Sequence, residues 1–214
     1  MSTIKANTVQ PTTTNANLNL NPDGSGAVIV DGLTFPTADG SANQYLKTDG
    51  SGNLDWVTAG GGKVGQVVQT TKTDTTSTTS TSAADITGMS VAITPSATSS
   101  KVLINFDVQG SADQSSGQNY HFHLLRATSA IFQGDAASSR TRCTVQGAES
   151  DGNGSSIHKS MMFLDSPSST SALTYKLQWE VQSGTLYLNR EHADGDDANA
   201  ARFVSQITVM EILA

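Results

Sequence analysis

Apolar and polar residues alternate with a period of two along most of the chain after residue 62. Residues 101–109 and 173–182 show this pattern most clearly, with large apolar side chains on one face and polar side chains on the other. A period of two is typical of a strand with one buried face. The same reasoning predicts further strands at residues 65–71, 89–94, 120–126, 141–145, 157–164, 185–189 and 203–213. No segment keeps the apolar period of 3.6 residues that marks an amphipathic helix.

These strands, with turns rich in Gly, Ser and Pro between them, predict an all-β fold. About 150 residues of chain are enough for one hydrophobic core. Many short strands with a period of two favour an antiparallel β-sandwich, most simply a jelly roll. Trp179 is expected in its core, because its neighbours on the same strand face include Tyr175 and Leu177.

The first 59 residues are more polar and carry only short strand-like segments. Residues 43–56, NQYLKTDGSGNLDW, predict a β-hairpin around a glycine-rich turn, with Leu54 and Trp56 on one face. Other short strands are expected at residues 4–9, 18–21, 27–30 and 33–35. Because a lone hairpin is unstable in water and about 60 such residues bury little surface, we expect three chains to share a core here. The alternative is a disordered tail.

A glycine triplet at residues 60–62 separates the two regions and suits a linker. It is not a phosphate-binding loop, because its spacing to Lys63 does not fit a Walker motif. The sequence thus predicts a trimeric β-rich stem at residues 1–59, a linker at residues 60–62 and a distal sandwich at residues 63–214.

Composition narrows the classes of function. Only 14% of the 214 residues are charged, the net charge is −7, and Lys and Arg form no cluster. A negatively charged chain repels phosphate backbones, so nucleic-acid binding is not expected. The first nine residues lack the apolar core of a signal peptide, and no apolar run reaches the ~18 residues of a membrane span. Insertion into a membrane is therefore not expected either.

His121 and His123 occupy alternate positions of the predicted strand at residues 120–126 and therefore share its polar face. On a three-fold axis the pair would supply six nitrogen ligands in an octahedral arrangement, which suits iron or nickel. One such pair is weak support, and we expect no metal and no cofactor. The favoured interpretation is that both histidines face solvent or a neighbouring chain.

A second polar cluster follows the predicted strand at residues 185–189. We predict a binding rim within the loop at residues 189–199, formed by Asn189, Arg190, His192, Asp194 and Asp196. These groups can hydrogen-bond sugars. The loop lacks the spacing and the terminal glutamate of an EF-hand, so calcium binding is not expected. The alternative is a solvated turn that keeps an acidic tip soluble.

The sequence holds no constellation typical of catalysis. It contains no paired carboxylates in a defined frame, no nucleophile elbow and no phosphate-cradling glycine loop. Cys143 follows Arg140 and Arg142 without an evident base, so a buried structural thiol is the favoured interpretation. We therefore expect a structural or binding protein and not an enzyme.

Several stretches resemble bacteriophage tail-fibre and virion appendage proteins, particularly those of marine phages such as cyanophages and pelagiphages. They are residues 4–37, 39–56, 67–104 and 204–214. The resemblance implies a homotrimer that is made in the host cytoplasm and incorporated into the virion. It also implies a stem that docks to other virion proteins and a C-terminal knob that contacts a host surface glycan or outer-membrane protein.

Two groups of alternatives stay open beside a short tail fibre. The chain lacks an extended shaft, so a capsid spike, a decoration protein or a tail adaptor without receptor binding would also fit. A glycan-degrading tailspike is the third possibility, and it would require a pair of Asp or Glu residues in a groove.

Overall fold

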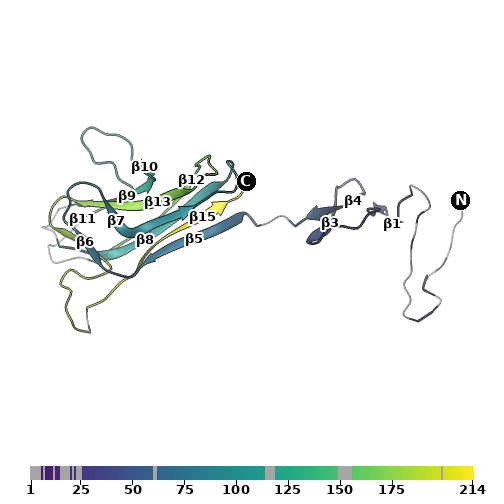
Figure 1. Ribbon diagram of the computed structural model, residues 1–214, viewed down its shortest axis with the longest axis horizontal. Coiled ribbons are helices and arrows are strands. Elements are labelled where there is room, and N and C mark those ends of the chain that lie inside the picture. The colour runs from purple at the N-terminus through teal and green to yellow at the C-terminus, as the bar shows by residue number, and fades with distance from the viewer. Residues whose placement is uncertain are drawn as a thin grey trace. The chain divides into compact units, whose positions relative to one another are not determined.

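The computed structural model in Figure 1 describes residues 6, 8–11, 13–14, 20, 22, 26–59, 62–113, 119–148, 156–198 and 200–214. Every element in these residues is a β-strand, and they contain no helix that is long and apolar enough to cross a membrane. The chain divides into two compact units, Met1–Gly60 and Gly61–Ala214, with the boundary inside the glycine triplet. The strands predicted at residues 4–9 and 18–21 lie largely outside the described residues.

The first unit contains two small antiparallel hairpins. Its strands are β1 (Ile29–Val30), β2 (Leu33–Thr34), β3 (Gln44–Thr48) and β4 (Leu54–Thr58), with β1 paired to β2 and β3 paired to β4. Between β3 and β4, the Asp49 carboxylate accepts hydrogen bonds from the backbone N–H groups of Ser51 and Asn53 at 2.7 and 3.1 Å. The predicted hairpin is confirmed. Its turn is held by the Asp49 side chain, which accepts hydrogen bonds from backbone N–H groups of the same turn.

This unit buries little of its surface. Trp56 lies against Gly40, where a Cβ would approach its ring within 2.6 Å, and its indole N–H donates to the carbonyl oxygen of Ala38 at 2.9 Å. Nevertheless, none of residues 26–59 is fully buried, and Ile29, Val30 and other apolar side chains are exposed. A unit with so small a core needs further packing partners to be stable.

The second unit is a sandwich of two antiparallel sheets, as Figure 1 shows. Its strands are β5 (Val64–Lys72), β6 (Thr76–Thr78), β7 (Ala84–Ile93), β8 (Lys101–Asp113), β9 (Asn119–Arg126), β10 (Ser129–Ile131), β11 (Val145–Ala148), β12 (Ser156–Asp165), β13 (Leu173–Val181), β14 (Thr185–Leu188) and β15 (Ser205–Ile212). One sheet runs β5-β15-β8-β12 and the other runs β7-β13-β9-β11. This strand order, with successive main strands distributed over two sheets, is that of a jelly roll.

The long strand β8 organises the first sheet. It pairs with β12 along one edge, and with β15 and then β14 along the other edge. Its inward residues Val102, Ile104, Phe106 and Val108 are all buried, as the alternation predicts. Trp179 of β13 is only 3% exposed, so its predicted place in the core is confirmed.

The strand predicted at residues 141–145 is wrong, because β11 begins only at Val145. Upstream of β11, the chain bonds to the loop that follows β10. Arg142 Nε donates to the carbonyl oxygen of Gly134 at 2.8 Å, and the Gly134 N–H donates to the carbonyl oxygen of Cys143 at 3.3 Å. Cys143 is partly exposed and not fully buried as expected, although burial still raises the pKa of its thiol.

Candidate binding site

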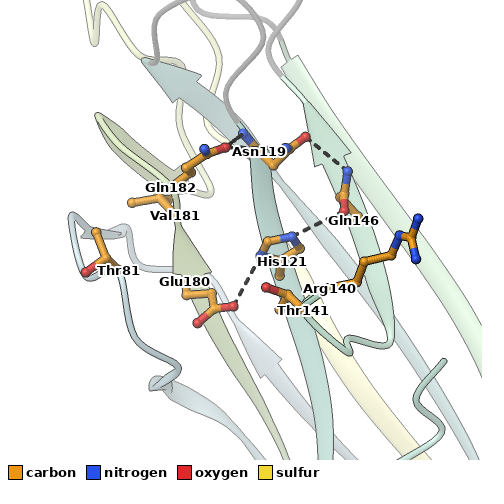
Figure 2. A pocket seen from close by; sticks show the side chains of 9 residues that line it. All are labelled: Thr81, Asn119, His121, Arg140, Thr141, Gln146, Glu180, Val181 and Gln182. Carbon is orange, nitrogen blue, oxygen red and sulfur yellow. Dashed lines mark hydrogen bonds and ion pairs between the residues drawn. The ribbon is translucent and has the colours of Figure 1, made fainter. Parts of the chain in front are cut away.

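A cavity of about 500 Å³ opens on the outer face of the sheet that contains β9 (Figure 2). Its walls come from three adjacent strands, β11, β9 and β13, and from the segments that precede β7 and β11. The lining residues are Thr81, Asn119, His121, Arg140, Thr141, Gln146, Glu180, Val181 and Gln182. Most of them carry a hydrogen-bonding side chain, so the cavity is polar.

The register of the three strands sets the centre of the site. Gln146 of β11 and Glu180 of β13 both lie directly opposite His121 of β9. Cross-strand neighbours of this kind have Cβ atoms ~5 Å apart, which places their side chains within contact. His121 Nδ1 lies 3.2 Å from Glu180 Oε1, and His121 Nε2 lies 3.2 Å from Gln146 Oε1.

A chain of amide groups continues from His121 across the cavity wall (Figure 2). Gln182 Oε1 accepts from the backbone N–H and from the side-chain nitrogen of Asn119, both at 3.3 Å, and Asn119 Oδ1 accepts from Gln146 Nε2 at 3.0 Å. Because a backbone N–H can only donate, it sets the direction of each bond in this chain. Gln146 therefore turns its side-chain oxygen toward His121 Nε2.

His123 lies one step further along β9, on the same face. Its Nε2 is 3.5 Å from Glu180 Oε1, and burial lowers the pKa of His123, with nearby His121 acting in the same direction and Glu180 opposing. The shared face predicted for the two histidines is confirmed. The expected exposure to solvent is wrong, because only 12% of the His121 side chain and 8% of the His123 side chain are exposed. The alternative expectation, that they face a neighbouring chain, stays a prediction.

Among the described residues, no three His, Cys, Asp or Glu side chains converge to hold a metal ion. The cavity instead offers separate polar groups to a ligand. Arg140 is exposed, and its guanidinium has no hydrogen bond or ion pair with any described residue. It lines the same cavity as Gln146 (Figure 2). Three amides, one cation, one carboxylate and the hydroxyls of Thr81 and Thr141 together suit a ligand with many hydroxyl groups.

The rim predicted from sequence lies elsewhere, since none of its five residues lines this cavity. Asn189 is fully buried. Its Nδ2 donates to the carbonyl oxygens of Lys72 and Asp74 at 2.8 and 3.0 Å, and its Oδ1 accepts from Ser205 Oγ at 2.6 Å. The side chain therefore joins three segments of the fold and presents no group to the surface.

The other four predicted residues lie at or near the surface. The Arg190 guanidinium stacks 4.1 Å above the Tyr187 ring and pairs with Asp194 at 3.1 Å, and Asp194 also pairs with Arg202. His192 is partly exposed, whereas Asp194 and Asp196 are exposed. The structure thus brings Arg190 and Asp194 together.

The residues that line the cavity were not predicted as a site. The sequence places His121 on the polar face of one predicted strand, and Glu180 and Gln182 on the polar face of another. The pairing of β9 with β11 and β13 is what brings them together, and a single sequence carries no signal for that pairing.

Comparisons with known proteins identify no relative by sequence, because no protein family and no curated protein matches the chain. Three solved structures of infectious bursal disease virus align with 75% of it. The VP2 subviral particle is 12% identical with a TM-score of 0.38, the Gt strain 13% with 0.34 and the Gx strain 14% with 0.29. The aligned part spans 35%, 40% and 44% of those chains. These likenesses are too weak to support an inference, and the jelly roll rests on strand pairing alone.

Proposed function

We propose that this protein is a structural component of a virus particle, a short phage tail fibre whose jelly-roll unit binds a saccharide on the host cell. The observation that carries the proposal is the polar cavity around His121. The resemblance of the sequence to phage appendage proteins supports a location on a virion. The division into a small N-terminal unit and a larger distal unit fits a fibre that is attached at one end.

A saccharide is the ligand class that best matches the cavity. Its volume of about 500 Å³ lies within the range of small-molecule sites. Sugars present neighbouring hydroxyls that both donate and accept, and the amides of Asn119, Gln146 and Gln182 can do the same. Arg140 adds N–H donors at the edge of the cavity, which could also donate hydrogen bonds to a sugar carboxylate.

Binding without cleavage is part of the proposal. Glycoside hydrolysis generally uses two carboxyl groups about 5 to 10 Å apart, one on each side of the scissile bond. Glu180 is the one acidic residue among those that line the cavity, and it is already engaged by His121. A reducing-end assay on host polysaccharide tests this point, and release of sugar by the purified protein would contradict it.

We also propose that the N-terminal unit joins three chains. None of its residues 26–59 is fully buried in a single chain, yet several of its apolar side chains are exposed. Packing these side chains against other copies would remove them from water. Light scattering at dilute concentration should give the mass of a trimer, and a stable folded monomer would overturn this part.

The double variant R140A/Q146A tests the cavity directly. It should reduce binding of the full-length protein to host cells and to host surface polysaccharide by at least about tenfold, because both side chains offer hydrogen bonds to the ligand. Gln69→Ala, an exposed amide on the other sheet, is the matched control and should leave binding unchanged. Equal binding by the double variant and wild type, with melting temperatures unchanged, would exclude the cavity as the receptor site.

A further inference from the structure

The outer face of the sheet β5-β15-β8-β12 is divided into a polar half and an apolar half. The apolar half, here called the apolar strip, consists of Val64, Val67, Leu103, Met162, Leu164, Met210 and Ile212, and the exposed Lys101 of β8 lies at its end, opposite Ile212. Strand register makes the strip continuous. Leu103 of β8 lies opposite both Met210 of β15 and Leu164 of β12. Met210 in turn lies opposite Val67 of β5, so one apolar row crosses all four strands.

The polar half of this face has internal partners. Gln69 Nε2 donates to Gln206 Oε1 at 2.6 Å and to Thr208 Oγ1 at 3.0 Å. His158 Nε2 lies 2.8 Å from Asp107 Oδ2. Each of these side chains therefore has at least one polar partner within one chain.

The apolar strip differs, because water covers much of it in a single chain. Met162 is 60% exposed and Val67 is 56% exposed. Isolated apolar side chains are common on protein surfaces, but a contiguous group on one sheet face marks an interaction site.

We infer that the apolar strip packs against the jelly-roll unit of a second copy of this chain. The inference rests on the trimer proposed above and adds the surface through which the distal units meet. Val64, the first residue of β5, belongs to the strip, and β4 ends at Thr58. The intervening chain can span no more than about 20 Å.

This short connection favours a second copy over other occupants. When N-terminal units associate, their connections hold the Val64 ends of neighbouring strips close together, and the effective concentration of one distal unit near another is high. A host receptor has no such tether. Met162 and Met210 suit a contact between copies, because their flexible thioether side chains adapt to an irregular partner surface.

Methionine oxidation of the full-length protein tests the inference. Oxidation of methionine follows its access to solvent, so a single chain would let Met162 react nearly as fast as in urea-unfolded protein. If a second copy covers the strip, Met162 should react at least about tenfold more slowly in the native protein than in the unfolded protein. Met89, which is fully buried in the core, provides the protected reference in the same sample.

A charged substitution gives an independent measurement. Leu164→Glu should lower the melting temperature of the assembled protein, because a charge is costly to bury inside an interface. In a single chain Leu164 is 44% exposed, so the same charge would be tolerated there. Thr71→Glu, on the polar half of the same face, is the control and should melt like wild type.

The outcomes separate this inference from the proposed trimer. A monomer in light scattering overturns both. A trimer in which Met162 reacts as freely as in unfolded protein, and in which Leu164→Glu melts like wild type, overturns the inference alone and assigns the strip to a different partner.

Discussion

The Ser205 hydroxyl donates a hydrogen bond of 2.6 Å to the side-chain oxygen of Asn189, and both residues are buried. Asn189 follows β14 with a backbone φ of 61°, in the left-handed region that asparagine tolerates better than most residues. Its side-chain nitrogen donates to two carbonyl groups at the end of β5 and just beyond it. One amide therefore ties β5, β14 and β15 together beneath the loop that was predicted to bind ligand.

Asn189→Ala should destabilise the protein by about 3 kcal/mol. The substitution leaves the Ser205 hydroxyl and two carbonyl groups without their buried partner, and alanine tolerates the positive φ less well. Urea unfolding monitored by circular dichroism measures the loss. Asp196→Ala, exposed in the same loop, should stay within about 0.5 kcal/mol of wild type. A variant at Asn189 that is as stable as wild type would show that these hydrogen bonds do not support the loop.

The loop surface can be tested while Asn189 is kept. Replacing Arg190, His192, Asp194 and Asp196 together with alanine should leave the oligomeric state and the melting temperature nearly unchanged, because surface ion pairs contribute about 0 to 1 kcal/mol each. If the loop contributes to the binding rim, adsorption of the protein to host cells should fall. Unaltered adsorption with an intact fold would remove these side chains from consideration and leave the cavity around His121 as the candidate.

The pattern along single strands predicts much of the fold. The buried faces of β8 and β13 can be predicted directly from the alternation of apolar and polar residues. Because all the large apolar side chains of such a strand lie on one face, that face is the one that packs into the core. The short strands β6 and β10 were not predicted. Each has only three residues, and so short a segment does not show enough alternation to distinguish a strand from a turn. The start of β11 was misplaced because bonds to the loop after β10 decide it, and those bonds join segments about nine residues apart.

The site was harder to predict than the fold. Local clustering pointed to residues 189–199, where polar groups lie close in sequence. The cavity is instead built from residues that are distant in sequence: His121 and Glu180 meet because β9 pairs with β13. Asn189 was misjudged for a related reason, since its polar side chain is satisfied by distant backbone groups and not by solvent. A polar residue in a loop is therefore not necessarily exposed to solvent.

Trp179→Ala should destabilise the distal unit by about 3 to 5 kcal/mol, because it removes a large side chain from between two packed sheets. Urea unfolding of the full-length protein measures this loss through the transition of the larger unit. Trp56→Ala is the comparison. Its side chain is only partly buried against Gly40 in the small unit, and its loss should leave the distal transition in place. If Trp179→Ala melts at the same temperature as wild type but no longer adsorbs to host cells, Trp179 belongs to a binding surface and not to the core.

Glu211 should make stability depend on pH in the acid range. Its side chain lies at the inner side of β15, where Oε1 accepts from the Ser96 hydroxyl and backbone N–H, both at 2.6 Å, and Oε2 accepts from Gln66 Nε2 at 2.9 Å. The bonds from Ser96, with that from Gln66, lower the pKa of Glu211 from 4.5 to about 2, while burial opposes the shift. The folded protein therefore releases this proton more readily than the unfolded chain does.

A group with a depressed pKa in the folded state contributes stability that is complete above its unfolded pKa and is lost on acidification. For Glu211 that window runs from pH 4.5 down to about 2. Glu211→Gln keeps the shape but not the charge, so wild type should exceed the variant in unfolding free energy at pH 6, and the difference should shrink steadily toward pH 2. Urea unfolding at pH 6, 4 and 3 measures this difference in unfolding free energy. Glu191 is a partly exposed carboxylate in the loop after β14, so Glu191→Gln is the matched control. A difference between wild type and Glu211→Gln that stays constant across this range would mean that the Ser96 and Gln66 bonds do not favour the ionised carboxylate.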